Sequence, residues 1–292
     1  MIEDTIVVRP PSEANSFLLP VTVGCSHNTC TFCGTFYNFP FRTIDIAEIK
    51  AYIDAVARNY SRSIRRVFLE NGDALAAPYP VLREVLLYLQ EKFPAIERVG
   101  SYASPASVLG KTDEELKDLR ESGLTIAYLG VETGDREILK QVKKGATYEQ
   151  IVEAGQRLKK AGIVTSVTVI LGLGGVEQSE RHAVATGKIL TDIDPDYAGA
   201  LTLMLVPGTP LHKDWQEGRF KLISPMQSLV ELKLIVENSN FTDCFFTANH
   251  ASNYLPIRAR LPQQKEALLQ RIQQVIDRND PSLLKSESMR AL

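Results

Sequence analysis

Residues 124–175 read LTIAYLGVETGDREILKQVKKGATYEQIVEAGQRLKKAGIVTSVTVILGLGG. The stretch begins with one apolar run, and a second apolar run, rich in β-branched residues, lies near its end. Such runs are typical of buried strands. Between them the apolar residues recur at helical spacing, and Thr147 with Gln150 forms a capping box at the start of the longer helix. The stretch therefore predicts a strand–helix–strand unit whose two strands run parallel.

The same alternation extends over most of the chain. Six strands with their following loops are predicted at 17–25, 65–70, 96–103, 124–132, 163–175 and 196–210. Helices are predicted between them at 43–60, 81–93, 112–123, 135–142, 147–162 and 180–193. Regular alternation of this kind requires a parallel sheet, because the crossover helices cover its faces. A partial or complete barrel fits the pattern, and so does an open doubly wound sheet.

A shorter α/β extension is predicted over residues 221–292. Ser224 can cap a helix that starts at Pro225, and a second helix is predicted over 261–277. No low-complexity linker divides the chain. We therefore expect a single domain over residues 1–292, with a core at about 17–220.

The composition narrows the class of protein. The 292 residues are 44% hydrophobic, which is ample for a large core. A net charge of -2 argues against an electrostatic nucleic-acid binder. The first residues lack the basic start and apolar stretch of a signal peptide, and no apolar run reaches membrane-spanning length. We expect a cytoplasmic protein without a membrane partner.

Three of the four cysteines lie within residues 24–33, GCSHNTCTFC. An electron-transfer [4Fe–4S] cluster is held by four thiolates, so Cys25, Cys30 and Cys33 would leave one iron with an open position. A loop after the first strand of a βα barrel lies at the carboxyl end of the strands, where such folds build their sites. Two other interpretations fit the cysteines: a structural zinc site completed by His27 or Cys244, and a redox pair of Cys30 with Cys33.

The segment resembles the cluster loop of the radical S-adenosylmethionine (SAM) superfamily, including the aromatic Phe32 before the last cysteine. The commonest spacing in that superfamily has three residues between the first two cysteines, whereas this chain has four. The resemblance implies a partial (β/α)6-type TIM barrel, a [4Fe–4S] cluster on Cys25, Cys30 and Cys33, and SAM on the open iron. It also implies reductive cleavage of SAM to a 5′-deoxyadenosyl radical, and a reduced flavodoxin- or ferredoxin-type electron donor.

Later strand ends continue the resemblance. Glu70, Asn71, Gly72 and Asp73 in FLENGDAL take the place of a Gly-Gly-Glu turn that recognises the methionyl amino group. The stretch 124–175 resembles a branch that includes oxygen-independent coproporphyrinogen oxidases, methylthiotransferases and Elongator-type proteins, and this implies that Glu132 contacts SAM. We interpret Lys144 as an ordinary exposed lysine of a loop.

Two further loops belong to the same resemblance. Ile170 and Gly172 match an Ile-x-Gly arrangement against the adenine, where a glycine allows close backbone approach. The glutamate usual three residues after that glycine is replaced by Gly175. Pro207 and Gly208 match a Pro-Gly-Thr-Pro loop near the cofactor.

The remaining candidate residues surround these motifs. Residues 243–256, DCFFTANHASNYLP, offer His250 and Tyr254 as catalytic groups near a substrate, with His250 suited to proton transfer. Ser104 is a candidate cofactor contact, Glu13 is expected to line the mouth together with Arg9 and Ser16, and Cys244 is interpreted as a small buried hydrophobic residue.

Taken together, these motifs predict a radical SAM enzyme that abstracts hydrogen from an unidentified small molecule or cofactor precursor. A non-catalytic cluster or haem carrier on the same fold is the alternative, because the coproporphyrinogen-oxidase branch contains such members.

Overall fold

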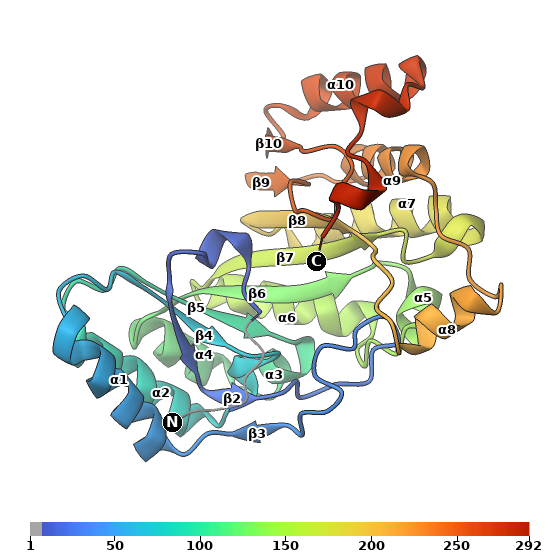
Figure 1. Cartoon of the computed structure of the whole chain (residues 1–292). Helices are drawn as coiled ribbons and strands as arrows, with labels where there is room; N and C mark the ends of the chain where they lie inside the picture. Colours follow the sequence, from blue (N-terminus) through green and yellow to red (C-terminus); the bar gives the residue numbers. More distant parts are fainter. Residues whose placement is uncertain (1–7, 292) are drawn as a thin grey trace. The chain divides into compact units, whose positions relative to one another are not determined.

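The computed structural model describes residues 8–291, and their contacts divide them into two compact units (Figure 1). The first unit holds residues 8–28, 35–129 and 153–165, and the second holds 29–34, 130–152 and 166–291. The chain passes from one unit to the other within two strands and one helix. The expectation of a single domain over the whole chain stays a prediction, and it includes residues 1–7 and 292, which lie outside the described part.

Parallel strands form the centre of the first unit. β1 (Phe17–Pro20), β4 (Arg66–Glu70), β5 (Arg98–Ala103) and β6 (Leu124–Glu132) pair in that order, and each pair is parallel. The last residues of β6 belong to the second unit. A short antiparallel ladder of β2 (Thr22–Val23) and β3 (Arg42–Thr43) lies beside the predicted cysteine segment in the sequence.

Helices cover the first unit: α1 (Ile46–Tyr60), α2 (Tyr79–Lys92), α3 (Pro105–Leu109), α4 (Asp113–Glu121) and the 3-10 turns η1 (Pro11–Glu13) and η2 (Ala74–Ala76). Ile49 and Ile53 of α1 are fully buried, as their helical spacing predicts. The capping box of Thr112 with Glu115 is formed at the start of α4. Capping side chains and buried faces thus place these helices where the periodicity predicts them.

A buried ionic network lies at the amino ends of the strands in this unit. Glu13, which is 0% exposed, accepts hydrogen bonds from Arg98 Nη2 and Tyr128 Oη at 2.5 Å each. Ser16 Oγ donates to the same carboxylate at 2.5 Å. Because Arg98 is the first residue of β5, the network lies at the end of the strand opposite to the expected mouth. The prediction that Glu13 and Ser16 line the mouth is therefore wrong.

We expect Glu13→Ala to lower the free energy of unfolding by about 3 kcal/mol, because it leaves Arg98 and Tyr128 buried without their acceptor. Urea unfolding measures the effect. Glu84→Ala is the matched control, since Glu84 forms a half-exposed ion pair with Lys50, and such pairs contribute about 0 to 1 kcal/mol. Equal losses in the two variants would contradict a stabilising role for the buried network.

The second unit continues the α/β pattern. β7 (Val164–Leu171), whose first residues belong to the first unit, pairs in parallel with β8 (Tyr197–Thr202), and β8 pairs in parallel with β9 (Cys244–Thr247). β10 (Arg258–Leu261) returns antiparallel to β9. The helices are α5 (Arg136–Gln141), α7 (Gly175–Ile193), α8 (Pro210–Gln216), α9 (Pro225–Glu237) and α10 (Lys265–Arg278), followed by η3 (Pro281–Leu283) and η4 (Glu287–Met289). The helix α6 (Tyr148–Lys160) begins in the second unit, and its residues from Glu153 on belong to the first.

Local signals explain these elements. Ser224 caps α9 with Pro225 in its first turn, and Thr147 exchanges hydrogen bonds with Gln150 at the start of α6. α7 and α9 pack side by side (Figure 1). The predicted α/β class with a mostly parallel sheet is confirmed. The short helices α3 and α8, the β2–β3 ladder and β10 were not predicted. Among the described helices, none combines the length and the apolar character needed to cross a membrane.

Candidate functional site

The predicted site residues fall in both units. Cys25 belongs to the first unit, whereas Cys30 and Cys33 belong to the second. All three are half-buried thiols outside any disulfide. Accordingly, within residues 8–291 no group of three or more His, Cys, Asp or Glu side chains is gathered as a metal site.

In the first unit, the turn after β4 packs directly against the cysteine segment. The Gly72 amide donates a hydrogen bond to the Gly24 carbonyl at 3.1 Å. A Cβ atom on Gly72 would lie 2.7 Å from Cys25 Cβ and 2.8 Å from Phe36 Cε2. These separations exclude any side chain, so only glycine allows the turn to approach the thiol this closely.

Asp73, the last residue matched to the Gly-Gly-Glu turn, fixes the same turn, a structural role that was not predicted from the sequence. Its carboxylate is fully buried and accepts hydrogen bonds from Ser26 Oγ at 2.5 Å and from Ser104 Oγ at 2.6 Å. The Ser104 amide donates to the other oxygen at 3.1 Å. Ser104 also caps α3 in a capping box with Ser107. The structure thus places Ser104 as a link between the end of β5 and the residue after Cys25.

Glu70 and Asn71 are buried polar residues with unsatisfied atoms. They are 3% and 1% exposed. Within the described part of the chain, Glu70 Oε2 and both side-chain polar atoms of Asn71 have no hydrogen-bond partner. Asn71 also has a φ of 81°, a conformation that costs energy outside glycine. Since buried polar groups are normally paired, this end of β4 fits a ligand that donates hydrogen bonds, such as an ammonium group.

Burial raises the pKa of Glu70 to about 7, against the opposing charge of Arg9. Because the ordinary value is 4.5, the folded chain holds this proton over a range where the unfolded chain has lost it. The contribution of Glu70 to stability is therefore complete below pH 4.5 and is lost as the pH rises to about 7.

We expect Glu70→Gln to flatten the decline in the free energy of unfolding between pH 4.5 and 7, by roughly 1 to 3 kcal/mol in total. Urea unfolding at several pH values measures this. Glu121→Gln, on the exposed side of α4, serves as the control. An unchanged pH dependence in Glu70→Gln would show that Glu70 is already ionised near its ordinary pKa.

In the second unit, Thr31 anchors the segment that carries Cys30 and Cys33. Its amide donates to the Val142 carbonyl at 3.0 Å, and its carbonyl accepts from the Leu211 amide at 2.9 Å. The segment is thereby attached both to the end of α5 and to α8. Phe32 and Ile170 pack against one apolar cluster, formed by Ile138, Val142, Leu173, Leu203 and Leu211. The structure therefore brings these two predicted cofactor contacts to the same apolar surface.

Glu132 lies at the end of β6 in a strained turn. Its φ is 65°, and the Thr133 amide donates to the Val131 carbonyl at 2.8 Å across it, as in a γ-turn. Glu132 Oε1 lies 2.8 Å from Lys144 Nζ, and the two side chains are only 13% and 11% exposed. A Cβ atom on Gly130 would lie 2.4 Å from Glu132 Oε1, so a side chain there would displace the glutamate from its present position. The interpretation of Lys144 as an ordinary exposed lysine is wrong.

The loops after β7 and β8 are placed by glycines. Gly172 has a φ of 81°, and a Cβ atom there would lie 3.0 Å from Ile223 Cγ1. Pro207 and Gly208 form the exposed tip of a turn that the Thr209 amide closes on the Val206 carbonyl at 3.2 Å. Each of the predicted loop residues therefore follows the carboxyl end of a parallel strand.

His250 is tied to the end of β8 through Ser252. His250 Nδ1 lies 3.2 Å from the Ser252 amide and 2.9 Å from Ser252 Oγ, which in turn accepts from the Thr202 amide at 3.2 Å. Burial lowers the pKa of His250, and the charge of Lys285 lowers it further. Because Nδ1 accepts the amide hydrogen, the neutral ring carries its proton on Nε2, which has no hydrogen-bond partner in the described part of the chain.

Tyr254 contacts the C-terminal segment. Its hydroxyl donates to Glu287 Oε2 and accepts from Arg290 Nη1, both at 2.6 Å. The pKa of Tyr254 is raised to about 12, mainly by burial.

Cys244 is 0% exposed, and burial raises its pKa to about 12, which confirms the interpretation of a small buried residue.

Arg290, which the sequence did not single out, attaches the C-terminal segment beside β8 (Figure 1). Its side chain is 4% exposed. It donates to the Ser252 carbonyl at 2.6 Å and to the Leu203 carbonyl at 2.9 Å, and the guanidinium lies 4.3 Å from the centre of the Tyr254 ring. The final residues thus cover the loop that carries His250.

We expect Arg290→Ala to destabilise the C-terminal segment by about 1 to 3 kcal/mol, because several acceptors lose their donor. Limited digestion with proteinase K, followed by mass spectrometry, measures faster cleavage after residue 280. Arg278→Ala, at the exposed end of α10, is the control. Equal cleavage rates in the variant and the control would show that Arg290 does not hold the segment.

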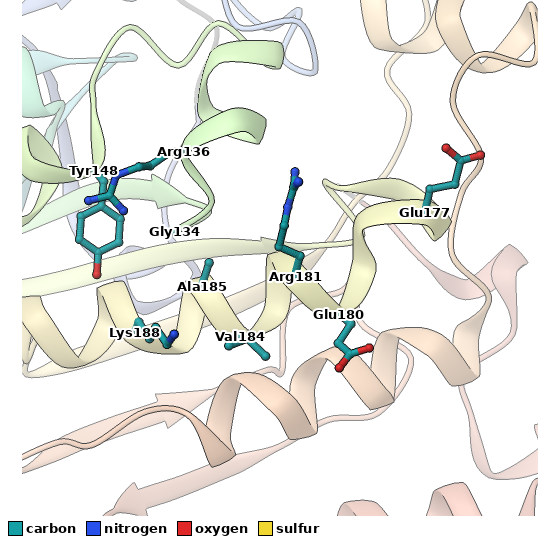
Figure 2. Close-up of a pocket in the computed structure, with 9 residues that line it drawn as sticks. All are labelled: Gly134, Arg136, Tyr148, Glu177, Glu180, Arg181, Val184, Ala185 and Lys188. Atoms are coloured by element: carbon teal, nitrogen blue, oxygen red, sulfur yellow. The ribbon is translucent and has the colours of Figure 1, made fainter.

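A groove of about 600 Å³ lies elsewhere in the second unit and contains none of the predicted site residues (Figure 2). It is lined by Gly134, Arg136, Tyr148, Glu177, Glu180, Arg181, Val184, Ala185 and Lys188. Arg136 pairs with Glu149, and Arg181 Nε lies 2.7 Å from Asp135 Oδ2. These arginines are already neutralised, so the groove offers no concentrated charge for a ligand.

Comparison with known proteins identifies the family to which the chain belongs. The model of the radical SAM superfamily matches residues 19–186. A tRNA uridine(34) acetyltransferase of Methanocaldococcus infernus is 30% identical over 112 residues, which are 38% of this chain and 21% of that protein. The heme chaperone HemW of Bacillus subtilis is 20% identical over 69% of this chain and 56% of its own length. The chain therefore spans less than two thirds of either relative.

Among solved structures, coproporphyrinogen III oxidase (HemN) from Escherichia coli aligns with a TM-score of 0.55 at 18% identity. The alignment covers 76% of this chain and 51% of HemN. At this identity the likeness concerns the fold alone, and it agrees with the α/β fold that the alternation of strands and helices predicts.

Proposed function

Because the chain belongs to the radical SAM superfamily, we propose that it is an enzyme that uses a [4Fe–4S] cluster and SAM to abstract hydrogen from an organic substrate. Members of the superfamily bind both cofactors. When bound, the two cofactors supply the cleavage of a carbon–sulfur bond and the removal of a hydrogen atom from the substrate. In this proposal Cys25, Cys30 and Cys33 hold the cluster.

The observation that carries the proposal is the set of unsatisfied polar atoms on Glu70 and Asn71, next to the turn that packs on Cys25. The methionyl amino group of SAM is an ammonium group and offers the missing hydrogen-bond donors. Its positive charge also favours the ionised form of Glu70, whose pKa burial holds near 7.

The second unit carries further residues of the proposal. Glu132, which pairs with Lys144 at 2.8 Å, is a proposed contact of SAM. Phe32 and Ile170 provide an apolar surface for a flat base, and Gly172 allows its backbone to approach that base. Pro207 and Gly208 border this region in the proposal, and Ser104 acts by holding Asp73.

For the substrate, the proposal is a small molecule or cofactor precursor near His250. The Nε2 hydrogen of His250 is available to donate a hydrogen bond or a proton, and Ser252 fixes the ring through Nδ1. Tyr254 orients Arg290 and the C-terminal segment beside it. A reduced flavodoxin- or ferredoxin-type protein is the proposed electron donor. The alternative function is that of a haem or cluster carrier, and the similarity to the heme chaperone HemW supports this alternative.

Anaerobic reconstitution with iron and sulfide tests the proposal. We expect a brown protein that, after reduction, converts SAM to 5′-deoxyadenosine, measured by liquid chromatography with mass spectrometry. Cys33→Ala should lose both the colour and the product. Cys244→Ala is the matched control, because Cys244 is buried in β9 and should leave both unchanged.

Three outcomes would contradict the proposal in different ways. A colourless protein with stoichiometric zinc would favour the structural zinc site. A brown protein that binds haem but forms almost no 5′-deoxyadenosine would favour a carrier. Full activity in Cys33→Ala would remove the assignment of the cluster ligands.

A further inference from the structure

A buried glutamate outside the part matched to the family model contacts the turn after β7. Glu231, in the middle of α9, is 0% exposed. Its Oε2 accepts a hydrogen bond from the Gly172 amide at 2.6 Å, and its Oε1 accepts one from Ser179 Oγ of α7 at 2.6 Å. The carboxylate therefore joins three elements: the end of β7, the first turns of α7 and the middle of α9.

Among residues 8–291, His182 is the basic side chain that lies near this carboxylate. His182 Nε2 lies 3.8 Å from Glu231 Oε2, but burial lowers the pKa of His182 to about 4, so the ring is neutral. His182 Nε2 donates instead to the Ile170 carbonyl at 3.0 Å, and Thr133 Oγ1 lies 2.8 Å from Nδ1. Two hydrogen-bond donors thus stabilise a buried acid whose pKa burial raises to about 7. Burying such a group lowers the stability of the protein unless its hydrogen bonds compensate for the lost hydration.

The turn itself explains why the acid comes from α9. Gly175, three residues after Gly172, has a φ of 63°, and a Cβ atom there would lie 3.0 Å from the Lys221 carbonyl oxygen. A glutamate at position 175 is therefore disfavoured by both its backbone conformation and the limited space. The Gly175 amide instead donates to the Gly172 carbonyl at 3.0 Å. Both polar groups of the Gly172 backbone are thus held, the amide by Glu231 and the carbonyl by Gly175.

We propose that Glu231 is a positioning residue for the nucleoside part of SAM: it fixes the Gly172 amide so that the turn presents its backbone, with Ile170, to the flat base. This rests on the proposed function, since it assumes that the turn after β7 binds the adenine. It also gives α9, in the extension after residue 220, a direct part in building the cofactor site.

Binding of 5′-methylthioadenosine to the full-length, cluster-reconstituted protein tests this inference. The probe carries the nucleoside but lacks the methionyl group, so Glu70, Glu132 and Lys144 do not enter the result. Equilibrium dialysis gives the affinity, and thermal unfolding gives the stability of each variant.

We expect Glu231→Leu and Glu231→Asp to weaken binding of the probe about tenfold or more, because the first removes the acceptor and the second withdraws it from Gly172. Glu231→Gln should stay within about threefold, since the amide oxygen still accepts from Gly172 and the amide nitrogen donates to Ser179. Glu237→Gln, at the exposed end of α9, should bind as the unchanged protein does.

Unchanged affinity in Glu231→Asp, or in a folded Glu231→Leu, would overturn the inference even if stability falls, and SAM cleavage by the unchanged protein would then leave the proposed function intact. Equal weakening in Glu231→Gln and Glu231→Asp would also overturn it, because the acceptor is retained in only one of them. If the unchanged protein binds neither the probe nor SAM, both proposals fail together.

Discussion

The approach of Gly72 to Cys25 is the constraint on which the candidate site depends. A side chain at position 72 would overlap the cysteine, so the turn after β4 can lie there only as bare backbone. This contact brings the end of one strand against the segment that begins the cysteine motif. The two residues before Gly72 are buried as well, and in the described part of the chain Glu70 Oε2 and both side-chain polar atoms of Asn71 have no hydrogen-bond partner.

Three buried carboxylates near proposed cofactor residues differ in their hydrogen-bond partners and therefore in their roles. Asp73 is fully hydrogen-bonded to Ser26 and Ser104 and stabilises the cysteine segment. Glu231 accepts from two donors, one of them the Gly172 amide, which suits it to hold that backbone amide in place. Glu70 retains an unsatisfied oxygen, so it is the one that a positively charged ligand would complete.

Much of the fold could be predicted from the sequence because its signals are local. Helical periodicity, capping boxes at Thr112 and Thr147, and the Ser224–Pro225 start are properties of neighbouring residues, and each predicted element was found. Two short helices were missed although their signals are present: Thr209 caps α8 and Ser104 caps α3, each followed by a proline. Helices this short bury too few residues to show a periodic apolar face.

The candidate site was less predictable, because its contacts join residues far apart in the chain. Nothing near Glu231 in the sequence shows that it reaches Gly172, and Arg290 gives no local sign that it contacts Leu203. Lys144 was misjudged for the same reason, since its burial depends on Glu132 and Gly130.

The most direct test of the central claim is a Mössbauer spectrum of the protein reconstituted with ⁵⁷Fe, recorded without and with SAM. The proposed three-thiolate site predicts that SAM changes the signal of a single iron and leaves the other irons of the cluster unaltered. A spectrum that SAM does not change, or a cluster whose irons all have protein ligands, would contradict it.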